Sequence, residues 1–480
     1  MRYIFTFVNT IILSVLYIIF TKYWYLSVEY STLCSMSNFE KYALKKPQVL
    51  LPNGTIDLSK WSVIACDQFT QDKQYWQKVS AFVKDAPSTL HVILPEVYLD
   101  ELSESEKTTR TEKIHRTMQS YIEQSIFTAV HSFIYLERKT AYQRTRKGLI
   151  ACIDLERYDW NPAASSEIRA TEATILDRIP PRMHIREGAA LELPHIMLLI
   201  DDKDRLLIEK TGEAVKRSEH TPIYDFPLMM NSGHLRGWAV PDTLEADMLS
   251  ALETLQKQNT SADGTSFLFA VGDGNHSLAT AKTVWKNMKK QAGGTALSNG
   301  AFSIPAALEN NPLRYALVEL VNIYDKGLTF EPVHRVLFNT DCTEVLDFVR
   351  SKLGGTITSF ANRSELQKAV ESRQTSFGFI SEDTLFCLES DLDCLGVSAL
   401  QPVLDEFIAA KKIKIDYIHG ADETFSLAKK PNTVSILCPP IAKENFFSTI
   451  VKTGSLPRKS FSMGEASEKR FYLECRKLSR

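Results

Sequence analysis

The stretch Phe267-Leu-Phe-Ala-Val-Gly-Asp-Gly-Asn-His-Ser-Leu-Ala-Thr-Ala-Lys282 is the most informative part of this chain. Its five apolar residues, 267–271, predict a buried strand, and a short polar loop follows at 272–277. Apolar side chains at helical spacing from Leu278 onward then predict a helix. The first turn of a helix leaves backbone N–H groups unpaired and carries the positive end of the helix dipole, so this loop suits a phosphate or a carboxylate.

The side chains of the loop add chemistry to this predicted anion site. The candidate phosphate-binding residues are Gly272, Gly274, Asn275 and Ser277. Asp273 and His276 are candidate catalytic residues, because they place a carboxylate and an imidazole beside the phosphate. The alternative is a purely structural turn in which Asp273 or Ser277 caps the helix.

Basic residues elsewhere in the chain are candidates for completing the site. Arg236 and Arg335 are the candidate cations for a bound phosphate, with Arg458 in a supporting role. His234 and His334 are further supporting candidates, since a histidine can transfer a proton near neutral pH. Solvated turns and buried structural pairs are the alternatives at these positions.

Two carboxylates are candidates for the catalytic base or for a magnesium ligand. Asp67 follows the apolar run 61–66, and the ends of strands commonly carry site residues in α/β folds. Glu187 is the second candidate, and helix capping is the alternative for both. The sequence has no zinc-binding spacing, and magnesium carried with a nucleotide needs only one or two protein carboxylates, so the metal stays undetermined.

Composition sets limits on the class of protein. The 480 residues are 44% hydrophobic and 24% charged, as in an ordinary packed globular protein. The formal net charge of −2 provides no basic field, which argues against nucleic acid as a partner. The eight cysteines form no Cys-x-x-Cys pair and predict reduced, mostly buried thiols.

The N-terminal segment is strongly apolar. Residues 3–20 are long enough to span a bilayer, so residues 1–35 predict an uncleaved membrane anchor or an extension outside the folded body. Asn275-His276-Ser277 would be a glycosylation sequon in the secretory lumen, and a glycan there would block the predicted site. We therefore expect an anchored protein whose body faces the cytoplasm, or a cytoplasmic protein if translation starts at Met36.

Strand-like and helical patterns alternate through most of the remaining chain, which predicts an α/β or α+β protein. Predicted strands include 61–66, 148–154, 196–200 and 314–323, and predicted helices include 101–124 and 243–258. We expect two mixed α/β lobes, residues 47–240 and 241–480, with the 272–277 loop facing a cleft between them.

Several blocks resemble a family of uncharacterised bacterial and archaeal proteins, number 1015 among the domains of unknown function. The blocks are Trp61-Ser-Val-Ile-Ala-Cys-Asp-Gln-Phe-Thr70, Arg182-Met-His-Ile-Arg-Glu-Gly-Ala189, Leu193-Pro-His-Ile-Met197, Ser232-Gly-His-Leu-Arg-Gly-Trp238, Phe330-Glu-Pro-Val-His-Arg-Val336 and Leu456-Pro-Arg-Lys-Ser-Phe-Ser-Met-Gly-Glu-Ala466. The resemblance covers nearly everything from residue 47 to residue 480, and it implies little about activity.

The 272–277 loop also has a more distant resemblance, to the Asp-Gly-x-His-Arg signature of the ParB and sulfiredoxin superfamily, which includes a free serine kinase. The resemblance implies a loop that opens a helix and holds nucleotide phosphates. Asp273, Gly274 and His276 match the signature, whereas Ser277 stands where arginine is usual. That departure removes a bidentate phosphate donor, so one of the three arginines above would have to replace it.

Three functions fit these observations. The first is a nucleotide-dependent phosphotransferase acting on a small molecule, with ATP or ADP and magnesium as cofactors. In it, Asp67 or Glu187 orients or deprotonates the acceptor hydroxyl, and His276 donates to phosphate. The second is a non-catalytic regulator that binds a nucleotide or another small anionic ligand. The third is a scaffold protein, and the sequence leaves the oligomeric state open.

Overall fold

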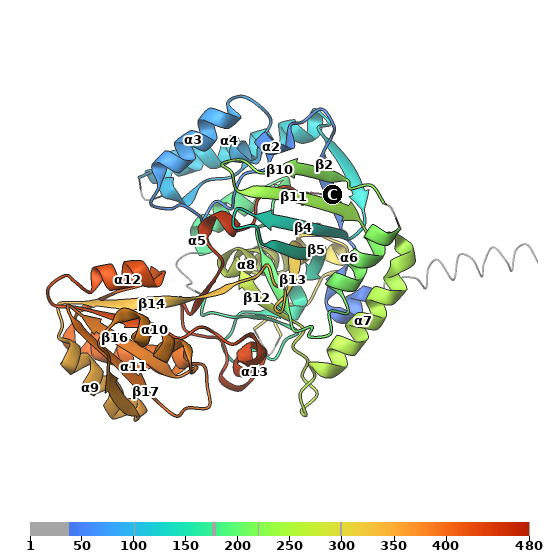
Figure 1. Cartoon of the computed structure of the whole chain (residues 1–480). Coiled ribbons are helices and arrows are strands. Elements are labelled where there is room, and N and C mark those ends of the chain that lie inside the picture. The colour runs from blue at the N-terminus through green and yellow to red at the C-terminus, as the bar shows by residue number, and fades with distance from the viewer. Residues whose placement is uncertain (1–37, 100, 175–178, 219, 298–299, 480) are drawn as a thin grey trace, which may run out of the picture.

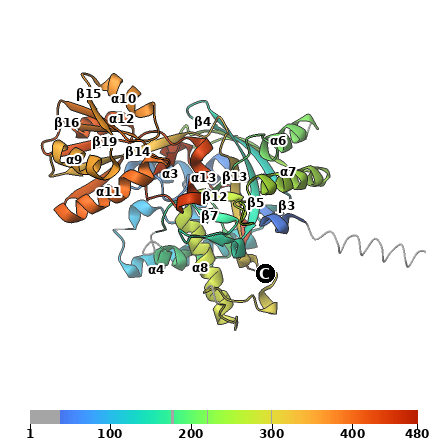
Figure 2. The same cartoon turned by 90° about the horizontal axis from the view of Figure 1, so that it is seen from below.

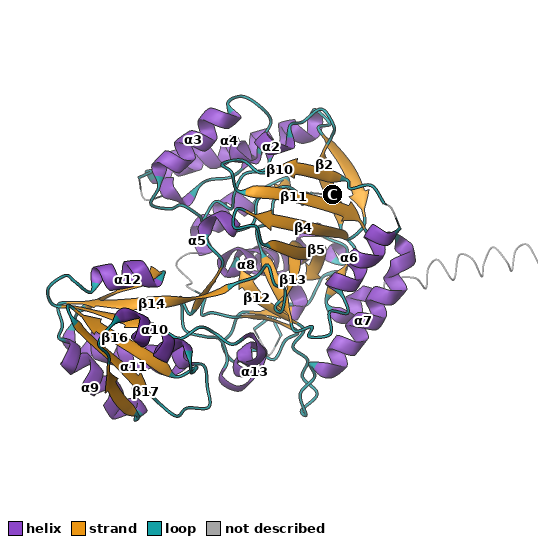
Figure 3. Ribbon diagram, in the orientation of Figure 1, coloured by secondary structure: helices purple, strands orange, loops and turns teal. Residues whose placement is uncertain are grey.

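The computed structural model describes residues 38–99, 101–174, 179–218, 220–297 and 300–479. The predicted anchor at 3–20 lies outside these residues. Within them, no helix is both long enough and apolar enough to cross a membrane. The described chain mixes helices and strands around two large sheets (Figures 1 and 3), which confirms the predicted mixed α/β character.

Ten strands form the larger sheet. Their order is β10-β11-β4-β5-β13-β9-β12-β7-β6, and β1 lies beside β5. In that order their bounds are β10 (Tyr224–Pro227), β11 (Gly233–Ala239), β4 (Ile134–Thr140), β5 (Thr145–Asp154), β13 (Tyr315–Asn322), β9 (Met197–Ile200), β12 (Phe269–Asp273), β7 (Ile168–Ala170) and β6 (Tyr158–Asp159), with β1 at Leu44–Lys45.

Both faces of the larger sheet are buried. On β5, Ala151 and Ile153 belong to one hydrophobic core, whereas Ile150 and Cys152 belong to the other, as the two-residue period of a strand requires. The first face is covered by α6 (Ile208–Arg217), α7 (Glu245–Gln258) and α8 (Asn275–Gln291), and the second by α3 (Lys73–Val83) and α4 (Glu104–Glu123). Burial on both faces explains why these strands are almost continuously apolar in sequence.

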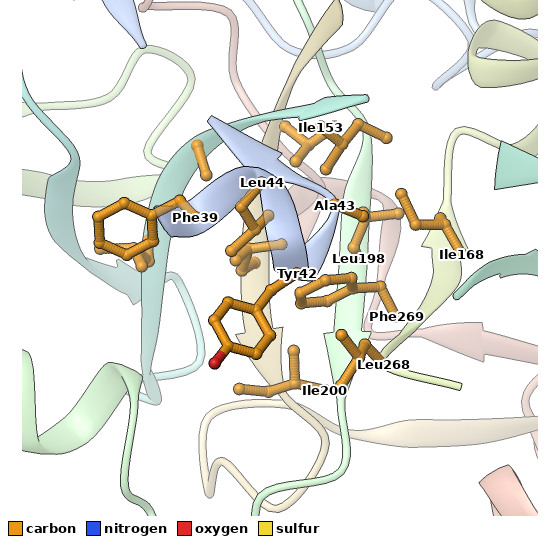
Figure 4. Close-up of a cluster of buried hydrophobic side chains, with 14 of the residues drawn as sticks. Phe39, Tyr42, Ala43, Leu44, Ile153, Ile168, Leu198, Ile200, Leu268 and Phe269 are labelled. Atoms are coloured by element: carbon orange, nitrogen blue, oxygen red, sulfur yellow. The ribbon is translucent and has the colours of Figure 1, made fainter. Parts of the chain in front are cut away.

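The first described residues are part of this packing. Figure 4 shows Phe39 and Tyr42, from the short 3₁₀ helix Asn38–Tyr42, in one cluster with Ile153 of β5 and Phe269 of β12. The folded body therefore already includes residues 38–46, ahead of the predicted start at residue 47.

The smaller sheet has seven strands in the order β15-β17-β16-β19-β14-β18, with β20 beside β14. Their bounds are β15 (Thr356–Ser359), β17 (Thr384–Glu389), β16 (Ser376–Ser381), β19 (Thr433–Leu437), β14 (Phe330–Phe338), β18 (Lys414–His419) and β20 (Phe461–Met463). One face is covered by α9 (Cys342–Leu353) and α11 (Gly396–Lys411), and the other by α10 (Arg363–Glu371) and α12 (Ala421–Leu427). Figure 2 shows this unit from below, beside the larger sheet.

The remaining elements connect these layers. They are the helices α2 (Leu58–Trp61), α5 (Ile179–Arg186) and α13 (Lys443–Thr453), and two ribbons in which β2 (Gln48–Pro52) pairs with β3 (Phe127–His131) and β8 (Leu191–Glu192) pairs with β21 (Arg476–Lys477).

The sheets do not divide at the predicted boundary between residues 240 and 241. The prediction assigned β12 and β13 to the second lobe, but both strands lie inside the larger sheet. β13 pairs antiparallel with β5 and parallel with β9, so strands far apart in the sequence share one core. Local patterns cannot report such pairings, because they show only that a strand is buried.

Residues 456–478, here called the C-terminal strap, run from the smaller sheet back to the larger one. The strap begins beside β14 through β20 and ends in the ribbon of β21 with β8. Between these points, Phe471 forms a bridge with Ile64.

The run 61–66 was predicted as a strand, and that prediction is wrong: α2 extends to Trp61, and only the single bridge at Ile64 follows. The strap supplies the backbone partner there, since Tyr472 N–H donates to the Val63 carbonyl.

A buried set of charges fixes the strap to the larger sheet. Glu319 of β13 has a side chain only 2% exposed, and its carboxylate lies 3.3 Å from Arg146 Nε and 3.6 Å from Arg470 Nε. Arg470 also pairs with Glu474. A Cβ at Gly148 would lie 2.6 Å from Glu319 Oε1, so glycine on the neighbouring strand makes room for this carboxylate.

We predict that Glu319→Gln lowers the free energy of unfolding by about 3–5 kcal/mol, because it leaves two buried arginines without their shared carboxylate. Urea unfolding of the full chain measures this change. Glu213→Gln is the matched control, since Glu213 pairs with Arg217 on the exposed surface of α6 and such pairs contribute little. Equal stability of the two variants would contradict the structural role given to Glu319.

Candidate functional site

The predicted loop is a tight turn between β12 and α8. Gly274 has a φ of +81°, in the left-handed region that favours glycine, and a Cβ there would lie 2.9 Å from Ile196 Cγ1. At Gly272 a Cβ would lie 2.7 Å from the sulfur of Met463 in the strap. The two glycines therefore allow the turn and the close approach of its neighbours.

The first turn of α8 has no side-chain cap. Gly274 is the N-cap residue and makes no side-chain capping hydrogen bond, so neither Asp273 nor Ser277 caps the helix as the structural alternative required. Asp273 instead stabilises the turn: its Oδ1 accepts the Gly274 N–H at 2.9 Å, and its Oδ2 lies 3.3 Å from Nζ of Lys469. The N-cap position of α8 thus carries no capping side chain, and the positive end of the helix dipole there suits an anion.

His195 links this turn to Asp67. Its Nε2 lies 3.2 Å from Ser277 Oγ and 3.6 Å from Asp67 Oδ2. Its Nδ1 lies 3.0 Å from the hydroxyl of Tyr472 in the strap. The other carboxylate oxygen of Asp67 accepts a hydrogen bond from Gln68 Nε2 at 3.0 Å. Side chains from three distant segments, Asp67, Ser277 and Tyr472, therefore surround the imidazole of His195.

The charges of Asp67 and His195 support each other. Burial acts to lower the pKa of His195, but the neighbouring Asp67 carboxylate outweighs it, and the pKa is raised above its ordinary value. Burial acts to raise the pKa of Asp67, but the attraction of His195 outweighs it, and the pKa is lowered. An imidazolium next to a carboxylate is the form that this geometry favours near neutral pH.

These groups face a large cleft between the two sheets. Its volume is about 1310 Å³, which exceeds the roughly 300–1,000 Å³ of ordinary small-molecule sites. One wall is formed by Asp67 and the 272–277 turn, and the opposite wall by Tyr417 and His419 of β18. Basic residues of the strap, Arg458, Lys459 and Lys469, also line the cleft.

The structure brings together part of the predicted site. Asp67, all six residues of the 272–277 turn and Arg458 line the cleft. Arg458 lies over the ring of Tyr417, and its Nε donates to the Tyr417 hydroxyl at 3.3 Å. Glu187 is exposed after α5 and does not line the cleft, which leaves Asp67 as the better placed of the two predicted carboxylates.

The other predicted basic residues lie elsewhere. Arg236 and His234 are on β11, where Arg236 Nε donates to Asp225 at 2.7 Å and His234 Nε2 lies 3.1 Å from the same carboxylate. Neither residue lines the cleft, because their strand lies toward the far edge of the larger sheet.

Arg335 and His334 are buried in the smaller sheet. Arg335 donates to Gln401 at 2.9 Å and lies behind the ring of Tyr417. His334 accepts the Cys438 N–H at 3.1 Å, and burial lowers the pKa of His334 to about 4. Arg335 therefore supports a wall of the cleft without reaching into it.

Several residues of the site were not predicted from the sequence. His195 and Tyr472 form the centre of the network. Lys459 and Lys469, which the sequence offered among C-terminal charges that could equally be solvated, line the cleft as additional cations. Glu172 also lines the cleft and accepts the Ser460 N–H at 3.0 Å, which anchors the turn that carries Lys459. A histidine just before a buried strand was the available signal for His195, but nothing in the sequence connects it to residue 472.

The site has few ligands for a resident metal. Among the described residues, no group of three or more His, Cys, Asp and Glu side chains is arranged to hold a metal ion. Asp67 and Asp273 are the cleft carboxylates beside the amides of α8, and magnesium bound with a nucleotide needs no more than one or two such ligands.

A family profile described as "Protein of unknown function (DUF1015)" matches residues 50–407. The chain belongs to this family. No curated protein matches the chain. The match ends before the C-terminal strap, so Lys469 and Tyr472 lie outside the matched range.

Three solved structures illustrate the wider similarities. A conserved hypothetical protein from Pyrococcus furiosus is 12% identical, with a TM-score of 0.34 over 68% of this chain and 95% of that chain. A mutant free serine kinase in complex with AMP is 11% identical, with a TM-score of 0.36 over 68% and 92%. Another free serine kinase mutant, in complex with ADP, is 10% identical, with a TM-score of 0.35 over 68% and 92%. Similarities this low support no inference about activity, and the likeness of the turn to ParB and sulfiredoxin stays a prediction.

We predict that Asp67→Asn lowers the pKa of His195, because it removes the charge that favours the imidazolium. An NMR titration of the His195 ring in the two proteins measures the shift. Asp72→Asn is the matched control: Asp72 lines the same cleft and caps α3 through the Tyr75 N–H, a role that asparagine also performs. A His195 titration unchanged in Asp67→Asn would contradict the pairing.

The same pair predicts how stability depends on pH. A raised folded-state pKa means that His195 contributes fully below its ordinary pKa of about 6.5, and that this contribution is lost as pH rises through the raised value. The lowered pKa of Asp67 means that its contribution is present above about pH 3.9 and lost as pH falls through the lowered value. Urea unfolding of both proteins at a series of pH values should show the largest loss of unfolding free energy in Asp67→Asn between about pH 3.9 and pH 6.5, where both contributions are present.

Proposed function

We propose that this protein is a nucleotide-dependent phosphotransferase that acts on the hydroxyl of a small molecule. The observation that carries the proposal is the uncapped N-terminus of α8, which opens with a glycine turn into a cleft that also contains a carboxylate and several cations. Amides and cations suit phosphates, and a carboxylate at the same cleft suits an acceptor hydroxyl.

The phosphates would bind to the backbone N–H groups that begin α8. Lys459 and Arg458 reach the cleft from the strap and would neutralise charge that spreads over the transferred group. They take the role that the sequence had assigned to Arg236 and Arg335. Magnesium would enter with ATP or ADP, supply further charge neutralisation, and take its protein ligand from Asp273.

Asp67 is the proposed base for the acceptor. The acceptor hydroxyl gives its proton to the Asp67 carboxylate, and its oxygen forms a bond to the terminal phosphorus of the nucleotide. The bond from that phosphorus to the bridging oxygen breaks, and the shortened nucleotide leaves with the bonding electrons. His195 acts on Asp67 as a positioning residue, since its charge holds the carboxylate in place and ionised.

A thermal shift experiment tests nucleotide binding. A ligand that binds only the folded chain stabilises it by about 2.7 kcal/mol at a hundred times its Kd, so ATP or ADP with magnesium should raise the Tm. Inorganic phosphate and adenosine, added separately, report which part of the nucleotide contributes. Absence of a shift with every nucleotide would refute the proposed function.

We predict that Lys459→Ala weakens nucleotide binding by at least about tenfold, because a hydrogen bond to a charged group contributes about 1.5–3 kcal/mol. Calorimetric titration of each variant with ATP or ADP measures the loss. Lys452→Ala is the matched control, since Lys452 is exposed on α13 and pairs with Asp393 rather than lining the cleft. Equal losses in both variants would show that the effect is not specific to the cleft.

Enzyme and regulator are distinguished by Asp67. We expect Asp67→Asn to keep nucleotide binding and to lower phosphoryl transfer to a panel of hydroxyl compounds by at least about a hundredfold, the usual effect of removing a general base. Transfer is followed by ³¹P NMR of the products. If the wild-type chain binds nucleotide but phosphorylates nothing in the panel, the result favours a non-catalytic regulator over an enzyme.

A further inference from the structure

A second cavity lies directly behind His195. Its volume is about 150 Å³, roughly that of an engineered apolar cavity that binds benzene. Apolar side chains form most of its lining, among them Leu94, Met118, Leu191 and Leu193. Small-molecule sites are commonly lined in this way, by apolar side chains with a few polar groups among them.

The polar groups of this cavity lie largely in internal pairs. Glu96 pairs with Arg182, and Arg186 pairs with Glu192 at 2.6 Å. The Cys66 thiol is neutral, because burial raises its pKa to about 12. The cavity therefore offers a ligand apolar contact and little net charge, which disfavours a charged group inside it.

The cavity and the large cleft adjoin each other. Glu96, Leu99, Pro181, Arg182 and Ser277 line both of them. His195 lines the cavity, and its Nε2 lies 3.6 Å from Asp67, which lines the cleft. A molecule with its apolar part in the cavity could thus place a polar end past Ser277, near the Asp67 carboxylate.

We infer that the phosphoryl acceptor is an amphipathic alcohol, with an uncharged apolar group of about benzene size that binds in this cavity and a hydroxyl that faces Asp67. This inference deepens the proposed function and rests on it, because only a phosphotransferase has a phosphoryl acceptor. Binding of the alcohol itself requires no nucleotide, so the two ideas fail separately.

The test uses 1-hexanol as the apolar probe and ethylene glycol as the polar one. Saturation-transfer NMR on the full chain without nucleotide measures the binding of each. Ala189 lines the cavity, so Ala189→Leu fills it, whereas the neighbouring Ala190 does not line it and Ala190→Leu is the matched control. Leu193→Phe is a second filling variant, and circular dichroism checks the fold of each protein.

We expect 1-hexanol to bind the wild type and Ala190→Leu with similar affinity, and at least about tenfold more weakly to a folded filling variant. Ethylene glycol should bind none of them measurably. The inference is overturned if 1-hexanol fails to bind the wild type, or if both filling variants fold and bind it as the wild type does.

The nucleotide experiments separate this result from the proposed function. If no nucleotide shifts the Tm of any variant, but filling the cavity still removes 1-hexanol binding, the phosphotransferase proposal fails and the cavity stands as a site for apolar alcohols. If nucleotide binds equally in all variants and no apolar alcohol binds, the phosphotransferase proposal stands and the acceptor assignment falls. If both hold, the filling variants should raise the KM for 1-hexanol phosphorylation by at least about tenfold while nucleotide affinity stays unchanged.

Discussion

The buried ion pairs between the C-terminal strap and the larger sheet are the constraint on which the rest of the structure depends. Glu319 lies between Arg146 of β5 and Arg470 of the strap, where solvent scarcely reaches any of the three side chains. Separating these charges leaves the Glu319 carboxylate unpaired in a medium of low polarity, which is far costlier than losing an exposed pair. The strap is therefore fixed to the larger sheet by buried charges, although it has little regular structure of its own.

The candidate site uses this rigidity. Lys469 contacts Asp273 on one side of Arg470, and Tyr472 contacts His195 two residues beyond it. Four consecutive residues thus join the buried charges to both halves of the site. A turn with two glycines would be adaptable by itself, and its fixed neighbours give it one arrangement.

The sequence predicts the local parts of this arrangement and misses the long-range ones. A strand, a glycine turn and a helix could be recognised within 267–282, because each leaves its signal in adjacent residues. The run 61–66 was wrongly predicted as a strand, because its apolar residues fit the pattern of a buried strand. In the structure its only backbone bridge within the described residues is to Phe471 of the strap. Arg236 was plausible as an anion ligand until Asp225 was found beside it. The partner of a charged residue is set by tertiary packing, and no short motif records it.

The reliance of the site on its strap has a consequence for biosynthesis. The turn and the first part of α8 emerge from the ribosome about 200 residues before Lys469 and Tyr472, an interval of roughly 10–40 s at ordinary translation rates. Throughout that interval Glu319, once made, has no Arg470, and the imidazole of His195 has no Tyr472. The nascent polypeptide must therefore tolerate an open interior until residues 456–478 have been translated, and the site is complete only once this late segment packs against the larger sheet.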